Sequence, residues 1–241
     1  MRKRRYSTAG KLACVWCFAF VSVIVSSAQQ LDSAAVIQRV DAAVETRFEN
    51  VLGFTDIEHY AVFRGKDEIH PAAEMTAKST YRKGVGKSYT ILSQSGSAIL
   101  QKFGLRPLLD NETRINDPAK VRDSWFTSAN YVMKLKPGGI QRVDGRDCLA
   151  IAIHPKRSAP NMIEGTLWVD AKDYWLVKVQ GVASKSPSIW AGTTQMMRHY
   201  ALVDGYSQAM HARAESNSFL FGRTVIAIDY SDYHLQLRPA Q

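Results

Sequence analysis

The stretch IEGTLWVDAKDYWLVKVQG, residues 163–181, contains two runs of alternating residues on either side of a short polar turn. Residues 165–169 form the outgoing run, residues 170–173 the turn, and residues 174–179 the returning run. Alternation of β-branched and aromatic residues, bounded by Asp and Gly, is typical of a β-hairpin. We therefore expect this hairpin to lie at the centre of a large antiparallel sheet with one apolar face.

The N-terminus has the composition of an export signal. Basic residues lead into the apolar run 12–25, and small residues follow at positions 26 and 28. This run is shorter than the roughly 20 apolar residues that span a membrane. We expect residues 1–28 to be a cleaved signal peptide and residues 29–241 to form one periplasmic domain. A retained membrane anchor is the alternative.

Removal of the signal changes both the charge and the cysteine content. Its five basic residues, unaccompanied by acidic ones, account for the fall in formal net charge from +9 to +4. The basic character therefore gives little support to nucleic-acid binding. Cys14 and Cys17 would leave with the signal, so Cys148 would remain without a disulfide partner. We expect a buried thiol there, because Cys148 lies in an alternating run.

The rest of the chain predicts a mainly β, α+β protein. An amphipathic helix is expected first, capped by Asp32 or Ser33 and ended by Gly53. Further strands are expected at residues 57–64, 74–82, 88–94, 131–135, 140–143, 148–154, 197–203, 208–216 and 224–235. Short connections make these strands antiparallel, and such a sheet usually curls into a barrel or half-barrel.

Residues 97–130 interrupt the β pattern with helical spacing. A helix is expected over residues 97–109, bent or ended by Pro107. A second helix is expected to start at residue 116 or 117 and to continue through Phe126. The large apolar side chains of this block must pack on the sheet or on a ligand.

Motifs that carry chemistry do not occur in their required context. Gly86, Lys87 and Ser88 resemble the end of a phosphate-binding loop, but Tyr81 replaces its first glycine and a strand follows. The six histidines are scattered singly, without metal-ligand spacing. We expect no catalytic residue, no metal and no cofactor. An enzyme would require several histidines to meet carboxylates in one pocket.

The excess of apolar residues has two interpretations. The helices could simply fill the core of the curved sheet. Alternatively, they could form a lid over an apolar cavity that takes an acyl chain, since each buried methylene contributes about 0.8 kcal/mol. The pattern alone leaves both interpretations open, although an apolar stripe more often belongs to a core.

Several short stretches resemble one protein family. They are VDGR at residues 143–146 with Cys148 and Pro155-Lys156, GTLWVD at 165–170, YALVDG at 200–205, and FGR at 221–223 followed by DYSDY at 229–233. In these stretches, and in the order of its elements, the chain resembles the periplasmic outer-membrane lipoprotein carrier and sorting proteins, the Lol carrier fold. The resemblance implies an incomplete antiparallel barrel with a helical lid that binds acyl chains of lipoproteins or other lipids. It also implies transient contacts with envelope membranes or with membrane-bound donor and acceptor proteins.

Strand alternation then gives a candidate cavity. The expected apolar lining is Leu149, Ile151, Ile153, Leu167, Val169, Trp175, Val177, Val179, Met210, Ile226 and Ile228. The expected lid residues are Phe103, Leu108, Trp125 and Phe126. One β-bulge would reverse this alternation and would place Trp168 and Tyr200 inside instead. A non-catalytic sensor or protein-binding module on the same scaffold is the alternative function.

Overall fold

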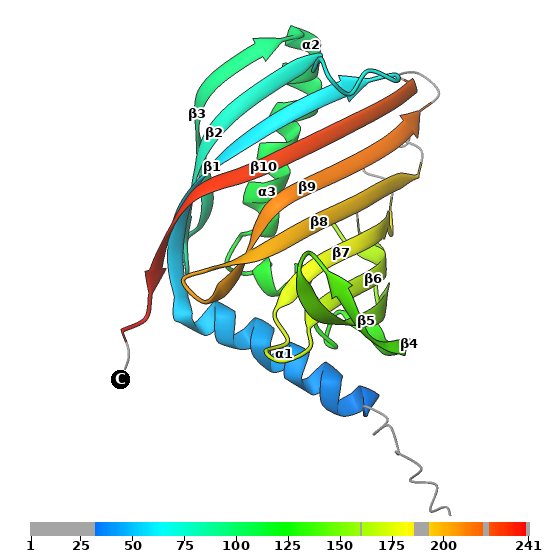
Figure 1. The fold of residues 1–241 in the computed structure, drawn as a ribbon. Coiled ribbons are helices and arrows are strands. Elements are labelled where there is room, and N and C mark those ends of the chain that lie inside the picture. The colour runs from blue at the N-terminus through cyan, green and yellow to red at the C-terminus, as the bar shows by residue number, and fades with distance from the viewer. Residues whose placement is uncertain (1–31, 160, 186–192, 219–221, 240–241) are drawn as a thin grey trace, which may run out of the picture. The chain divides into compact units, whose positions relative to one another are not determined.

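The computed structural model describes residues 32–159, 161–185, 193–218 and 222–239. The expected signal peptide, residues 1–28, lies outside this part of the chain. The described residues form one ten-stranded antiparallel sheet together with helical segments on one of its faces (Figure 1). The expected fold class, mainly β with a few helices, is confirmed.

The first elements in chain order are α1 (Ser33–Asn50), β1 (Val51–Arg64), β2 (Ala73–Arg82) and β3 (Gly86–Gly96). A helical block follows, with α2 (Ala98–Leu100), the π-helix η1 (Gln101–Leu105), α3 (Arg106–Ile115) and the 3-10 helix η2 (Val121–Ser124). The remaining strands are β4 (Tyr131–Val143), β5 (Arg146–Pro155), β6 (Ile163–Asp170), β7 (Leu176–Ala183), β8 (Thr194–Val203), β9 (Tyr206–Ser218) and β10 (Gly222–Leu237).

The sheet is open. Its strand order is β3-β2-β1-β10-β9-β8-β7-β6-β5-β4, so β3 and β4 are the two edges and do not pair with each other. These edge strands are consecutive in the sequence, and the helical block connects them. Figure 1 shows the sheet curving around α3, while α1 runs along the end of the sheet near β5 to β7. The expected incomplete barrel is therefore confirmed.

Helix α1 forms where the sequence predicted it. The Asp32 side chain accepts a hydrogen bond from a backbone N–H of the first turn, at 3.0 Å. Val36, Val40 and Ala43 are buried, and their spacing of three and four residues aligns them along one face of the helix. The helix thus buries one apolar stripe against the sheet.

The predicted end of this helix was wrong by a few residues. The helix stops at Asn50, and β1 begins directly at Val51. Gly53 lies inside β1, where a Cβ atom would approach the carbonyl oxygen of Tyr81 to 2.8 Å. This glycine therefore permits close strand contact and does not end a helix.

The first helix of the block runs further than the sequence predicted. Helical structure continues from Ala98 to Ile115, with a π turn at Gln101–Leu105. Pro107 follows that π turn, at the start of α3. A proline inside a helix removes one hydrogen bond, and the wider turn before it accommodates the loss. We call residues 98–115 the lid segment.

The second predicted helix, at residues 116–126, is reduced to the single 3-10 turn η2. Backbone hydrogen bonds here join residues three apart, as from Asp123 N to Lys120 O at 2.8 Å. Trp125 therefore follows the turn in extended conformation. The expected turn at residues 137–139 is instead a bulge in β4, where Gly138 and Gly139 have positive φ angles.

Candidate functional site

Two apolar clusters lie where helices cover the sheet. The first, which we call the α1 cluster, consists of Val36, Val40, Tyr131, Leu149, Ile151, Ile153, Met162, Ile163, Leu167, Val169 and Val179. The second, which we call the lid cluster, consists of Tyr60, Val62, Ala73, Met75, Leu105 and Leu109, with Tyr89, Leu100, Leu108, Ile226 and Ile228 packed against it. Eight of the eleven predicted lining residues lie in these two clusters.

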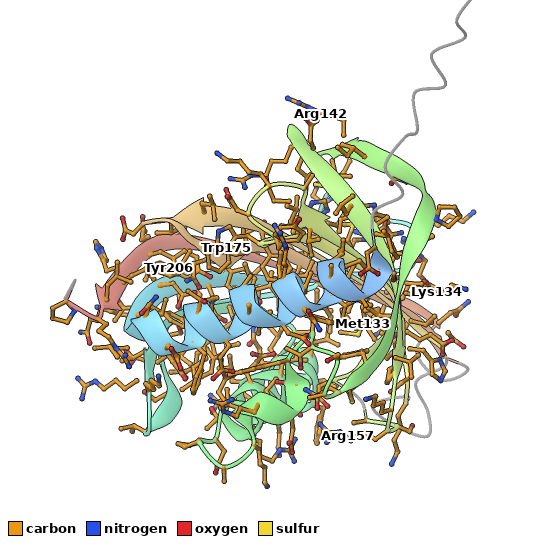
Figure 2. All side chains as sticks on the ribbon, turned by 90° about the horizontal axis from the view of Figure 1, so that it is seen from below. Met133, Lys134, Arg142, Arg157, Trp175 and Tyr206 are labelled. Carbon is orange, nitrogen blue, oxygen red and sulfur yellow. The ribbon has the colours of Figure 1, made fainter. Side chains whose placement is uncertain are left out.

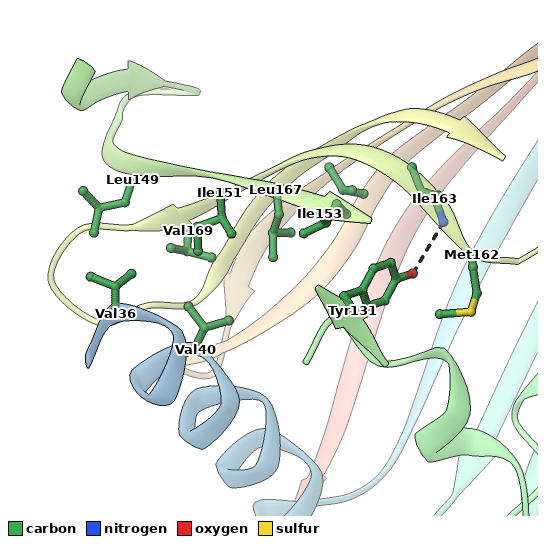
Figure 3. Close-up of a cluster of buried hydrophobic side chains, with 11 residues drawn as sticks. Val36, Val40, Tyr131, Leu149, Ile151, Ile153, Met162, Ile163, Leu167 and Val169 are labelled. Carbon is green, nitrogen blue, oxygen red and sulfur yellow. Dashed lines mark hydrogen bonds between the residues drawn. The ribbon is translucent and has the colours of Figure 1, made fainter. Parts of the chain in front are cut away.

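The α1 cluster contains six of the predicted lining residues, Leu149, Ile151, Ile153, Leu167, Val169 and Val179. Figure 3 shows Val36 and Val40 of α1 pointing toward these strand residues. No member of the cluster is more than 5% exposed. The Tyr131 hydroxyl also accepts a hydrogen bond from the backbone N–H of Ile163, at 3.4 Å. These side chains are therefore packed against α1.

The lid cluster contains two predicted lining residues, Ile226 and Ile228, and one predicted lid residue, Leu108. Leu105 and Leu109 of the lid segment are buried in it against strand residues of β1 and β2. The start of the lid segment is fixed by Gln101, whose Nε2 donates to carbonyl oxygens of β2 and β3 at 2.6 and 2.7 Å. The lid segment thus covers the apolar face of β1, β2 and β10.

Three predicted lining residues lie outside both clusters. Val177 is buried, and Met210 is half-buried at an irregularity between β8 and β9. Trp175 precedes β7, because the positive φ of 61° at Tyr174 extends the turn. Its ring meets Tyr206 edge-on, at 5.8 Å between centroids (Figure 2). It also lines a shallow groove between α1 and the β6–β7 turn.

The predicted lid residues occupy different environments. Phe103 is 71% exposed. Trp125 packs on Phe48 of α1, with ring centroids 4.6 Å apart. Phe126 packs against the α1 cluster, with its ring 5.5 Å from that of Tyr131. Only Leu108 of the four lies against the lid cluster.

The expected alternation is kept in β6 but not at the start of β7. A register shift between Trp168 and Val169 places Leu176, and not the expected Val177, against the α1 cluster. The expected central position of this hairpin was also wrong, because β6 and β7 lie toward the β4 edge of the sheet.

Leu167 and Val169 face the α1 cluster, whereas Trp168 donates from Nε1 to the Gln141 side chain, at 3.2 Å. Tyr200, offered as an inside residue under the opposite alternation, does pack against the α1 cluster. Because Tyr200 lies in β8 and Trp168 in β6, Tyr200 can face inward while Trp168 faces outward.

A group of polar side chains in the interior, which we call the interior polar belt, was not predicted from the sequence. It consists of Asp56, Glu58, Ser79, Lys87, Arg198, Gln208, Tyr230 and Tyr233. Several members occupy inward positions of their strands, because they lie two residues from apolar residues that face inward, as Glu58 does from Tyr60 and Arg198 from Met196. Charged residues at such positions in a strand pattern are the signal that could have revealed it.

A buried ion pair lies within the belt. Lys87 Nζ is 2.6 Å from Glu58 Oε1, and the two side chains are 8% and 1% exposed. Glu58 also accepts a hydrogen bond from the Tyr60 hydroxyl. Burial lowers the pKa of Lys87, but nearby Tyr89 and Glu58 outweigh this effect and raise it well above its ordinary value. For the Asp56 carboxylate, burial has the opposite effect and raises the pKa.

Two arginines point into the same interior without a carboxylate partner. Arg47 of α1 donates to the Ser207 carbonyl at 2.8 Å and to Gln208 Oε1 at 2.7 Å, and burial lowers its pKa. Arg198 of β8 hydrogen-bonds the Tyr200 side chain. Within the described part of the chain, no carboxylate lies within ion-pair distance of either guanidinium. Arg47 and Arg198 are therefore interior cations held by neutral oxygens, unlike Lys87, which pairs with Glu58.

Two histidine–aspartate pairs lie at exposed positions. His199 pairs with Asp144 at 2.5 Å, and His211 pairs with Asp229 at 2.7 Å. No three His, Cys, Asp or Glu side chains among the described residues are grouped so that they could hold a metal ion. Cys148 is buried, and burial raises its pKa to about 11. None of the helices in the described ranges has the length and apolar character to cross a membrane.

Comparisons with known proteins return structures only. No protein-family model matches the chain, and no curated protein matches it. One similar solved structure is a proposed outer membrane lipoprotein-sorting domain from Vibrio parahaemolyticus, at 13% identity and a TM-score of 0.46, covering 87% of this chain and 94% of that chain. A DUF1329 family protein from Desulfovibrio piger follows at 12% identity and a TM-score of 0.44, over 86% and 95% of the two chains. A LolA superfamily protein from Nitrosomonas europaea has 10% identity and a TM-score of 0.43, over 87% and 96%.

Proposed function

We propose that this protein is an exported carrier that holds the acyl chain of a lipid or lipoprotein between the lid segment and the sheet. The observation that carries the proposal is the lid cluster. There, an apolar sheet face is covered by a separate helical segment, and Leu105 and Leu109 fill the space beneath it. An acyl chain would take the place of these two side chains when the lid segment moves.

The two covering elements differ in how freely they could move. Helix α1 leads into β1 without an intervening residue, so displacing it would disrupt the sheet. The lid segment is followed by turns, and the next part of the chain is anchored on α1 by Asp41, which accepts hydrogen bonds from Ser128 N and Oγ at 2.8 and 2.5 Å. The lid segment also contains a π turn, a feature frequent at functional sites. We therefore place the acyl site under the lid segment.

The energies allow the exchange. Exposing two buried leucine side chains costs about 3 to 6 kcal/mol in all, since each contributes about 1.5 to 3 kcal/mol. An acyl chain regains about 0.8 kcal/mol for each methylene that it buries. Roughly four to eight buried methylenes therefore offset the displacement of Leu105 and Leu109. This number is within the length of one ordinary acyl chain.

The outer side of the lid segment fits a transient membrane contact. Ile99 and Phe103 are 67% and 71% exposed, one helical turn apart. Lys102 lies over the Phe103 ring at 5.3 Å, and Arg106 follows on the same segment. Apolar side chains flanked by cations suit the interface of an anionic membrane. The lid segment would thus meet the membrane where the lipid is exchanged.

Native mass spectrometry of the protein purified from a cell envelope, followed by organic extraction, tests the proposal. We expect a bound species with the mass of a phospholipid or an acylated protein. Ile228→Asn, beneath the lid segment, should lose this species. Ile140→Asn, at a 60% exposed position of β4, is the matched control and should keep it.

A ligand-free mass that persists when lipid is added would contradict the proposal, provided that circular dichroism shows a folded protein. The helices would then only complete the core. The scaffold would in that case better fit a non-catalytic sensor or protein-binding module. Mass analysis of the N-terminus of the exported protein tests the cleavage after Ala28.

A further inference from the structure

Arg198 lies between the two apolar clusters on the sheet. The strand register places Arg198 of β8 opposite Val179 on one side and opposite Ala212 of β9 on the other. Ala212 is in turn opposite Ile228 of β10, and Ile228 is opposite Tyr60 of β1. Val179 belongs to the α1 cluster and Tyr60 to the lid cluster. Arg198 therefore borders the proposed acyl site, two strands from Ile228.

The partners of Arg198 are neutral. It hydrogen-bonds Tyr200 and lies near Tyr230, and none of its described neighbours is a carboxylate within ion-pair distance. The arginines of the outer face differ. Arg213 and Arg223 each contact both Glu68 and Glu215, at 2.5 to 3.1 Å. A half-buried cation without a counterion is unfavourable unless an anion joins it.

The lid segment carries one carboxylate, that of Glu112, near Arg198. Glu112 of α3 is close enough to Arg198, Lys87 and Tyr230 to influence their protonation. It remains farther than an ion-pair distance from both cations. Glu112 is thus an anion of the lid segment that faces the interior cations without neutralising them through direct contact.

We propose that Arg198 binds the oxyanion headgroup, carboxylate or phosphate, of an amphiphile whose acyl chain lies beneath the lid segment. This inference rests on the proposed function. Small residues at Ala212 and Ala214 line the path on β9 from Arg198 toward Ile228 and Ile226. Two strand spacings of about 4.8 Å each separate Arg198 from Ile228, a length within the reach of one acyl chain. The incoming headgroup would repel Glu112 and would so favour opening of the lid segment.

Two probes with the same tail separate the headgroup from the chain. They are 11-dansylaminoundecanoic acid and its methyl ester, whose binding is measured by dansyl fluorescence. We expect the native protein to bind the acid at least tenfold more tightly than the ester, since an ionised hydrogen-bond partner strengthens the contact. Arg198→Gln should lower the affinity for the acid to that of the ester and leave the ester unaffected.

Three further variants make the result specific. Arg198→Lys keeps the charge and should retain most of the preference for the acid. Glu112→Gln should raise the affinity for the acid several-fold but not that for the ester, because a repelling anion is removed. Arg142→Gln, at an exposed ion pair of the β4–β5 hairpin, should change neither affinity.

The outcomes distinguish this inference from the proposed function. Equal binding of acid and ester by the native protein and by Arg198→Gln overturns the headgroup site and leaves the acyl carrier intact. Failure of both probes to bind overturns both. Binding of millimolar inorganic phosphate that depends on Arg198, without tighter binding of the tailed acid, overturns the amphiphile and points to a free oxyanion.

Discussion

The α1 cluster and the lid cluster are built from the same kinds of side chains, yet they are covered in different ways. The helix over the first cluster is continuous with β1, and every residue of that cluster is almost fully buried. The helix over the second is an insertion between the two edge strands. Apolar alternation alone therefore does not separate a core from a binding site. We propose that the attachment of the covering element does.

The largest expected effect comes from one matched pair of substitutions. Leu167 in the α1 cluster and Leu105 in the lid cluster are both 0% exposed. Leu167→Ala should lower the free energy of unfolding by about 4 kcal/mol, within the range of buried leucine truncations. Leu105→Ala should lower it by less than about 2 kcal/mol, because the lid segment opens before the sheet unfolds. Urea unfolding followed by circular dichroism measures both values.

Equal losses for the two leucines would break the comparison. The lid segment would then unfold together with the sheet, as part of one cooperative core. The lid segment would then be too stable to open separately from the sheet.

The next effect concerns the ion pair beside the lid cluster. Glu58→Gln should destabilise the protein by about 3 kcal/mol, because it leaves the buried Lys87 without its anion. The double variant Glu58→Gln with Lys87→Met should recover most of this loss. A loss below about 1 kcal/mol for the single variant would show that water reaches Lys87, as expected only for a surface pair.

Much of this arrangement could be predicted from the sequence. The alternation over residues 165–169 and 148–154 identified β6 and β5 and the inward side of each. Local pattern could not reveal that α1 covers those same residues, since this contact joins Val36 and Val40 to strands more than a hundred residues away. Whether an apolar face is open or covered is a tertiary property.

The errors have local physical causes. Trp175 was expected in the returning strand, but the left-handed conformation of Tyr174 delays the strand by two residues. The polar belt was missed because no inward position was assigned to Glu58 or Arg198. Each lies two residues from an inward-facing apolar residue of its own strand, Tyr60 in β1 and Met196 in β8, so both side chains face inward. A charge at an inward position is tolerated only with partners that the rest of the fold supplies.

Cysteine labelling sharpens the comparison further. Cys148 is buried and its pKa is raised to about 11, so it should react with iodoacetamide at pH 8 only when the protein unfolds. A cysteine introduced by Leu109→Cys should react at least a hundredfold faster through opening of the lid segment, a difference of about 2.8 kcal/mol. Peptide mass spectrometry reads each site separately. Equal protection of the two sites would indicate that the lid segment stays closed.

The smallest expected effect on stability lies at the outer side of the lid segment. Phe103→Ser should change the free energy of unfolding by less than about 0.5 kcal/mol, because the ring is 71% exposed. The same variant should bind anionic vesicles more weakly in a sedimentation assay. Val85→Ser, at a 74% exposed position of the β2–β3 turn, is the matched control and should bind them as the native protein does. If Phe103→Ser sediments with vesicles as the native protein does, the lid segment does not contact the membrane through Phe103.

The position of β10 has a consequence for folding. This strand, the last of the described chain, lies between β1 and β9 in the middle of the sheet. Strands β1 to β3 can form a meander early, but they cannot join β4 to β9 until β10 has been made and inserted. Such distant pairings slow folding and leave strand edges open for longer. Emerging chains would therefore carry two unfinished half-sheets, which a chaperone could hold apart until the final strand arrives.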